Sequence, residues 1–99
     1  MLAASEAETV VSSDRTANLY INFADGPGVY QLVVLDRKGT PVRALFRERV
    51  VAQADTWITW DGKDDQGKDI PEGESVVLFL KDGVELKRII VLRTVGNSP

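Results

Sequence analysis

The sequence contains neither cysteine nor histidine among its 99 residues. Without cysteine the chain cannot form a disulfide, a thiolate metal site or a thiol nucleophile. Without histidine it lacks the commonest catalytic base and metal ligand. No apolar run reaches the ~18 residues of a membrane-spanning helix, and the first residues lack the basic and apolar regions of a signal peptide. We therefore expect no enzymatic activity, no cofactor and no membrane insertion.

Acidic residues outnumber basic residues by 15 to 12, which gives a formal net charge of −3. A chain with this balance does not attract phosphates as a whole, so we expect no nucleic-acid partner. Most of the surplus lies in residues 61–74, where glycine and proline predict a long loop, the acidic loop. Apolar residues make up 43% of the chain and charged residues 27%, which is typical of a single globular domain.

Apolar and polar residues alternate with period two in several short segments, and this pattern predicts strands. Leu19, Ile21 and Phe23 share one face of the first such segment. Residues 76–80 are continuously apolar, which is typical of a strand that is covered on both faces or docks to a partner. The other predicted strands are residues 29–36, 56–60 and 84–93, and turn formers lie at residues 25–28, 36–39 and 82–83. Six or seven short strands predict an all-β sandwich.

One segment, residues 42–54, fits two structures. Val42, Leu45, Phe46 and Val50 fit the apolar stripe of a helix, whereas Val42, Ala44 and Phe46 fit a strand. The neighbouring strands and the short spacing favour a strand.

The chain is expected to form one domain between two short ends. Residues 1–15 predict a flexible lead-in or linker, in which Val10 and Val11 can add a short edge strand. Residues 16–93 form the predicted β-sandwich domain, and residues 94–99 form a polar tail.

The acidic loop is the candidate metal site. Asp61, Asp64, Asp65 and Asp69 supply the oxygen ligands that calcium prefers. Lys63 and Gln66, however, stand at positions where the calcium-binding loop of an EF-hand needs an acid and a glycine. The interpretation we favour is a long connection whose aspartates accept hydrogen bonds from backbone amides.

Two further features are candidate contact surfaces. Arg43, Arg47 and Arg49 form a basic cluster, interrupted by Glu48, that an acidic partner would recognise if it is not a solvated strand face. Alternation places Trp57 on the face opposite Trp60, where it is either an exposed anchor for a partner or a sugar ring, or a side chain packed over the sandwich edge.

Four motifs follow one another in a recognisable order. Residues 34–45 read as a strand, an Asp-x-x-Gly turn and a returning strand that ends in Val-Arg-x-Leu. Residues 60–67 read Trp-Asp-Gly-x-Asp-x-x-Gly, and Ile-Pro-Glu-Gly follows at residues 70–73. Residues 87–93, Lys-Arg-Ile-Ile-Val-Leu-Arg, form the last motif. This series resembles the immunoglobulin-like domain of the flagellar hook-capping protein, the FlgD-type Ig-like family, which also occurs at the C-terminal end of many exported bacterial proteins.

The resemblance implies an immunoglobulin- or fibronectin-III-like β-sandwich of about seven strands without catalytic residues. It also implies that Trp60 packs in the core, that Asp61 and Asp64 hold the acidic loop through backbone amides, and that glycines permit its turns. The residues of the motifs are Gly39, Trp60, Asp61, Gly62, Asp64, Gly67, Pro71 and Gly73.

The function that this resemblance implies is a non-enzymatic structural and interaction module of a bacterial exported, cell-surface or flagellar-type assembly. Its partners would be other protein subunits or a parent polypeptide, and its location extracellular or at the cell surface. The hook-capping protein usually carries an inserted second β-domain for which this chain has no room, which favours a free-standing or appended module. The alternative is a carbohydrate-binding or calcium-stabilised accessory module of a larger secreted enzyme, to which the acidic loop and Trp57 point. We expect contacts through Trp57, the three arginines and the second face of residues 76–80.

Overall fold

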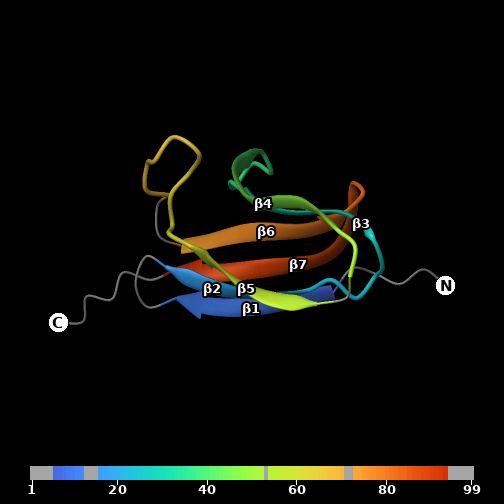
Figure 1. The fold of residues 1–99 in the computed structure, drawn as a ribbon. Coiled ribbons are helices and arrows are strands. Elements are labelled where there is room, and N and C mark those ends of the chain that lie inside the picture. The colour runs from blue at the N-terminus through green and yellow to red at the C-terminus, as the bar shows by residue number, and fades with distance from the viewer. Residues whose placement is uncertain (1–5, 13–15, 53, 71–72, 94–99) are drawn as a thin grey trace.

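The computed structural model describes residues 6–12, 16–52, 54–70 and 73–93, which form seven strands in two packed sheets (Figure 1). The strands are β1 (Glu6–Ser12), β2 (Ala17–Asn22), β3 (Gly28–Leu35), β4 (Pro41–Val50), β5 (Asp55–Trp60), β6 (Gly73–Lys81) and β7 (Val84–Arg93). The larger sheet has the order β1-β7-β6-β3-β4, and the smaller sheet pairs β2 with β5. The predicted all-β sandwich is thus confirmed, and it is consistent with an immunoglobulin-like architecture. The described residues contain no helix, and so none long and apolar enough to cross a membrane.

The core lies between the inner faces of the two sheets. Alternate residues of β2, β3 and β6 are buried, as period-two patterning requires. Rings of Phe23, Tyr30 and Phe79 meet at one end of this core, with centroids 4.9 to 6.1 Å apart. The buried apolar residues are Ala17, Leu19, Ile21, Phe23, Tyr30, Leu32, Val34, Trp60, Val77, Phe79, Ile89 and Val91.

Strand β1 corrects the expectation of a lead-in over residues 1–15. Glu6–Ser12 pairs in parallel with β7 along its whole length, and Val10 packs against the core opposite Val91. The expected edge strand at Val10 and Val11 is therefore present but longer, because the free edge of β7 offers backbone partners to all seven residues. The rest of the predicted lead-in and the predicted tail, residues 94–99, lie outside the described residues.

Strand β4 resolves the segment that also fitted a helix. Pro41–Val50 is a strand paired antiparallel with β3, with irregularities between Leu32 and Val33 and between Val34 and Leu35. Each irregularity shifts the alternation of side chains on β4. This shift explains why the apolar residues of β4 do not follow period two.

The predicted hairpin turn between β6 and β7 is also confirmed. Asp82 and Gly83 both have positive φ, 50° and 83°, as a two-residue hairpin turn of this kind requires. The Asp82 carboxylate accepts a hydrogen bond from the Val29 backbone N–H at 2.9 Å, and the Asp82 N–H donates to the Val29 carbonyl at 2.7 Å. The turn is therefore held against β3.

Candidate functional site

The acidic loop, described as far as Ile70, is held by its own aspartates. One carboxylate oxygen of Asp61 accepts the Lys63 N–H at 3.1 Å, and one of Asp64 accepts the Gln66 and Lys68 N–H groups at 2.9 Å each. These contacts confirm that Asp61 and Asp64 bind backbone amides. In Figure 1 the loop, drawn in yellow and orange, rises above the left-hand ends of β5 and β6.

The other motif residues also take the expected structural positions. The Trp60 side chain is fully buried, and its indole N–H donates to the Lys63 carbonyl at 3.0 Å. The expected core position of Trp60 is thereby confirmed. The glycines expected to permit turns have φ between 80° and 123°, a region that other residues rarely adopt, and they are Gly39, Gly62, Gly67 and Gly73. Pro71 lies outside the described residues.

Arg43 connects strand β4 to the acidic loop. Its Nη1 lies 2.9 Å from an oxygen of Asp61, 2.9 Å from the Lys63 carbonyl and 3.4 Å from the Asp64 carbonyl. Its Nε lies 3.8 Å from Asp65, whose carboxylate also accepts the Ala44 N–H at 3.2 Å. With only 25% of its side chain exposed, Arg43 is a structural tie and does not present a free cation to a partner.

These contacts change the pKa of Asp61. Partial burial raises it, but the hydrogen bonds from the Lys63 N–H and from the Arg43 guanidinium favour the ionised form and outweigh burial. The net effect lowers the pKa of Asp61, so its charged form holds the loop.

The four aspartates proposed as calcium ligands do not converge. Asp61, Asp64 and Asp65 are directed toward protein N–H groups and Arg43, and Asp69 pairs with Lys63 at 3.5 Å. Within the described ranges no three acidic side chains lie close enough to share a metal ion. The geometry favours a loop fixed by hydrogen bonds over a calcium site.

The predicted contact surface is divided by the fold. Arg43 stands opposite the buried Val34 on β3, whereas Arg47 and Arg49 stand opposite Gln31 and Val29. The irregular pairing of β4 with β3 lies between these positions, so Arg47 and Arg49 are exposed on the outer side of the large sheet. Trp57 lies on the outer side of the small sheet. The residues predicted to act together therefore occupy different sides of the sandwich.

The outer side of the large sheet carries an apolar face. Pairing places Val33 beside Leu78, and Val76 between Leu35 and Ile90. On the far side, Val11 lies beside Leu92, with 69% and 36% of their surfaces exposed. We call this surface the apolar face, and its residues are Val11, Val33, Leu35, Val76, Leu78, Leu80, Ile90 and Leu92. The continuous apolar run of β6 is thus explained, because one side of the strand packs in the core and the other belongs to this face.

The outer side of the small sheet carries two aromatic rings among polar side chains. Tyr20 and Trp57 are cross-strand partners with ring centroids 5.2 Å apart and planes inclined by 56°. Trp57 is 64% exposed, so it does not pack over the edge of the sandwich. We call this surface the aromatic face, and its residues are Asn18, Tyr20, Asn22, Asp55, Trp57 and Thr59. Trp57 was identified from the sequence but Tyr20 was missed, although each side chain points outward from a strand whose buried and exposed residues alternate.

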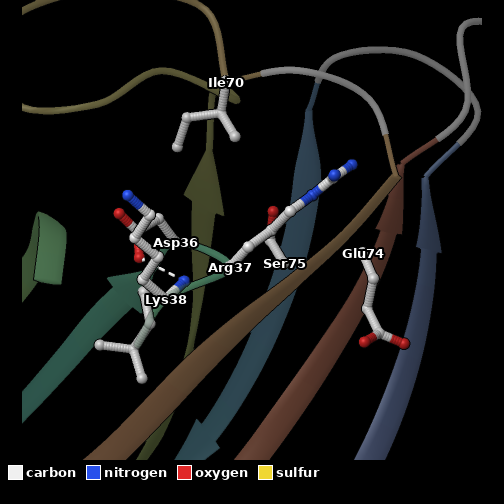
Figure 2. Close-up of a pocket in the computed structure, with 7 residues that line it drawn as sticks. Asp36, Arg37, Lys38, Ile70, Glu74 and Ser75 are labelled. Atoms are coloured by element: carbon white, nitrogen blue, oxygen red, sulfur yellow. Dashed lines mark hydrogen bonds between the residues drawn. The ribbon is translucent and has the colours of Figure 1, made fainter. Parts of the chain in front are cut away.

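A small pocket lies at one end of the sandwich, between the turn after β3 and the start of β6 (Figure 2). Its volume is about 280 Å³, which is just below the usual range for ligand sites. One carboxylate oxygen of Asp36 accepts the Lys38 and Thr40 N–H groups at 2.8 and 2.9 Å, so this side chain holds the turn beside the pocket. The lining residues are Leu35, Asp36, Arg37, Lys38, Ile70, Glu74 and Ser75. We assign no ligand to this pocket.

Comparison with known proteins adds no family assignment. No protein-family model matches the sequence, and no curated protein shows significant similarity to it. The fold, the partly exposed apolar face and the aromatic face are therefore the basis for a functional proposal.

Proposed function

We propose that the chain is a non-enzymatic, immunoglobulin-like interaction module of a bacterial exported, cell-surface or flagellar-type assembly, and that it acts through protein–protein contacts. The observation that carries this proposal is the apolar face. An antiparallel sheet usually packs one side on the core and presents polar residues on the other. Here four neighbouring strands, β1, β7, β6 and β3, present apolar side chains on the side that faces away from the core.

The size of the apolar face fits the centre of an interface. Three strand spacings of about 4.8 Å and five residues of about 3.4 Å each give an area of about 250 Å². The largest apolar patch on a typical monomer measures about 300–600 Å² and is often functional, and the apolar face lies just below that range. It is smaller than the ~800 Å² that each partner contributes to a stable interface, so contacts would extend to the surrounding polar rim.

The rim of the apolar face defines the chemistry of the partner. Arg47 and Arg49 lie beside it on the edge strand β4, and both are exposed. Arg88 stands within the apolar face, opposite Leu78, and is already paired with Glu85 at 3.1 Å. A partner that offers an apolar patch beside acidic side chains would match this arrangement, because interfaces combine an apolar centre with a polar, charge-complementary rim.

The resemblance to the FlgD-type family supports the same proposal. Trp60, Asp61 and Asp64 occupy the structural positions that the resemblance implies. The motif residues therefore stabilise the sandwich and leave its outer faces available for contacts. A scaffolding or assembly module requires this separation between residues that stabilise the fold and residues that contact partners.

Site-specific photo-crosslinking in cells of the source organism tests the proposal. A benzoylphenylalanine is placed at Leu78 in the apolar face or, as a control, at Gln66 in the acidic loop. We expect a discrete crosslinked protein from position 78 only, and a weaker crosslink when Arg47→Glu is added to the same chain. The absence of any product at position 78, or identical products at both positions, would overturn the proposal. Circular dichroism of each purified chain confirms that it is folded.

A further inference from the structure

The aromatic face has the composition of a ligand platform on a rigid support. Leu19 and Ile21, which alternate with its residues on β2, are fully buried in the core. The Tyr20 hydroxyl donates a hydrogen bond to the Asp55 carboxylate, and this bond raises the pKa of Tyr20. The Tyr20 ring is thus fixed at its hydroxyl, and the Trp57 ring lies against it.

Polar groups surround the two rings. Asn18 and Thr59 are cross-strand partners, and the Thr59 hydroxyl donates to the Asn18 side-chain oxygen at 2.8 Å. This bond leaves the two N–H donors of the Asn18 amide directed away from Thr59. Asn22 and Asp55 form the pair at the other end of the face. Donors and acceptors therefore lie on both sides of the aromatic pair.

The charge of this face selects among ligands that stack on aromatic rings. Nucleic acid bases also stack on tryptophan and tyrosine, but they bring phosphates that need a positively charged groove. The aromatic face instead carries the Asp55 carboxylate. Lys87, the nearby cation, donates at 3.4 Å to the Tyr20 carbonyl. The Asp55 carboxylate on the face itself favours a neutral ligand over phosphates and acidic sugars.

We propose that the aromatic face binds a neutral polysaccharide. A pyranose ring has an apolar C–H side that packs on an aromatic ring, and hydroxyls at its rim that pair with amide, hydroxyl and carboxylate groups. Both kinds of group occur together on this face. From Asn18 to Asn22 the face extends about 14 Å along β2, which suits a short stretch of a linear glycan.

Affinity electrophoresis tests this proposal. The chain is run in native gels that contain hydroxyethylcellulose, glucomannan or starch, with alginate as the acidic counterpart, and is incubated in parallel with insoluble cellulose and chitin. We expect at least one of the neutral polymers to retard or retain the chain. Trp57→Ala should weaken that binding by about tenfold or more. Tyr20→Phe, which removes the hydrogen bond to Asp55, should weaken it less.

Gln66→Ala, an exposed position in the acidic loop, is the control and should bind as the unmodified chain does. The proposal is overturned if no neutral polymer binds, if alginate alone binds, or if Trp57→Ala binds with full affinity. Thermal unfolding of Trp57→Ala, expected to stay close to that of the unmodified chain, separates lost binding from lost folding. Because the proposed protein contacts use the apolar face, failure of this experiment leaves them untouched.

Discussion

Three arginines lie within seven residues of strand β4, but the fold gives them two different tasks. Arg43 is largely buried and binds Asp61 and two loop carbonyls, whereas Arg47 and Arg49 are exposed. Strict alternation along a strand would place all three on one side. The irregular pairing between β3 and β4 breaks that alternation, and no local sequence pattern identified it. A basic cluster in the sequence is therefore not a cluster in the structure.

The different positions of the arginines predict different effects on stability. Arg43→Met should lower the free energy of unfolding by about 1–2 kcal/mol, because it removes the charge-assisted hydrogen bond to Asp61 and one of the donors to the Lys63 and Asp64 carbonyls. Arg47→Ala should change it by less than about 0.5 kcal/mol, as expected for an exposed side chain. Urea unfolding of both variants measures the difference. Equal effects would show that Arg43 does not hold the acidic loop.

The lowered pKa of Asp61 predicts a contribution to stability that depends on pH. Since the folded-state pKa lies below the unfolded value of about 3.9, the ionised carboxylate stabilises the fold above that pH, and this contribution is lost as the pH falls through the folded-state pKa. Asp61→Asn should therefore lower the melting temperature at pH 7. The difference in melting temperature between Asp61→Asn and the unmodified chain should become smaller as the pH falls.

Melting curves between pH 7 and roughly pH 3 measure this gap, with Leu78→Ser as the control whose profile should run parallel to that of the unmodified chain. Arg43→Met removes one of the groups that lower the pKa of Asp61. The fall in melting temperature of this variant in acid should therefore begin at a higher pH than in the unmodified chain. A gap between Asp61→Asn and the unmodified chain that stays constant over the whole range would contradict the assignment.

At the scale of whole elements, prediction from the sequence succeeded where the structure is locally regular. Leu19 and Ile21 on β2, and Ile58 and Trp60 on β5, alternate without interruption, so their strands and inward faces could be read directly. The pairing of β1 could not be predicted from the sequence, because it depends on the free edge of β7, which lies about 80 residues away along the chain. Parallel pairing between distant segments leaves little local signal.

Strand β1 should stabilise the large sheet without being needed for its formation. It is an edge strand whose apolar contact with the core is made by Val10. Deletion of residues 1–12 should lower the free energy of unfolding by about 2 kcal/mol, from the exposure of apolar surface at Val10 and β7. The free edge of β7 should also make the chain more prone to associate. Thermal unfolding and sedimentation velocity measure these effects; a shortened chain that is equally stable and monomeric would contradict this role.

At the scale of the whole molecule, the sandwich keeps its two candidate binding faces apart. The sequence identified one member of the aromatic face, Trp57, and one strand of the apolar face, β6. It could not identify the faces themselves, because each depends on pairing between distant strands: Tyr20 with Trp57, and β1, β7, β6 and β3 side by side. Residues that sequence analysis grouped into one surface thus belong to opposite sides.

This separation predicts that substitutions on the two faces act independently. Packed sheets lie about 10 Å apart, and side chains at that distance without shared partners contribute additively to stability within about 0.5 kcal/mol. Trp57→Ala and Leu78→Ser should each lower the free energy of unfolding by about 1 kcal/mol or less, and the double variant should show their sum. Urea unfolding of the three chains measures the coupling. A coupling well above 0.5 kcal/mol would contradict this independence and would show that the core between the two sheets transmits structural changes from one face to the other.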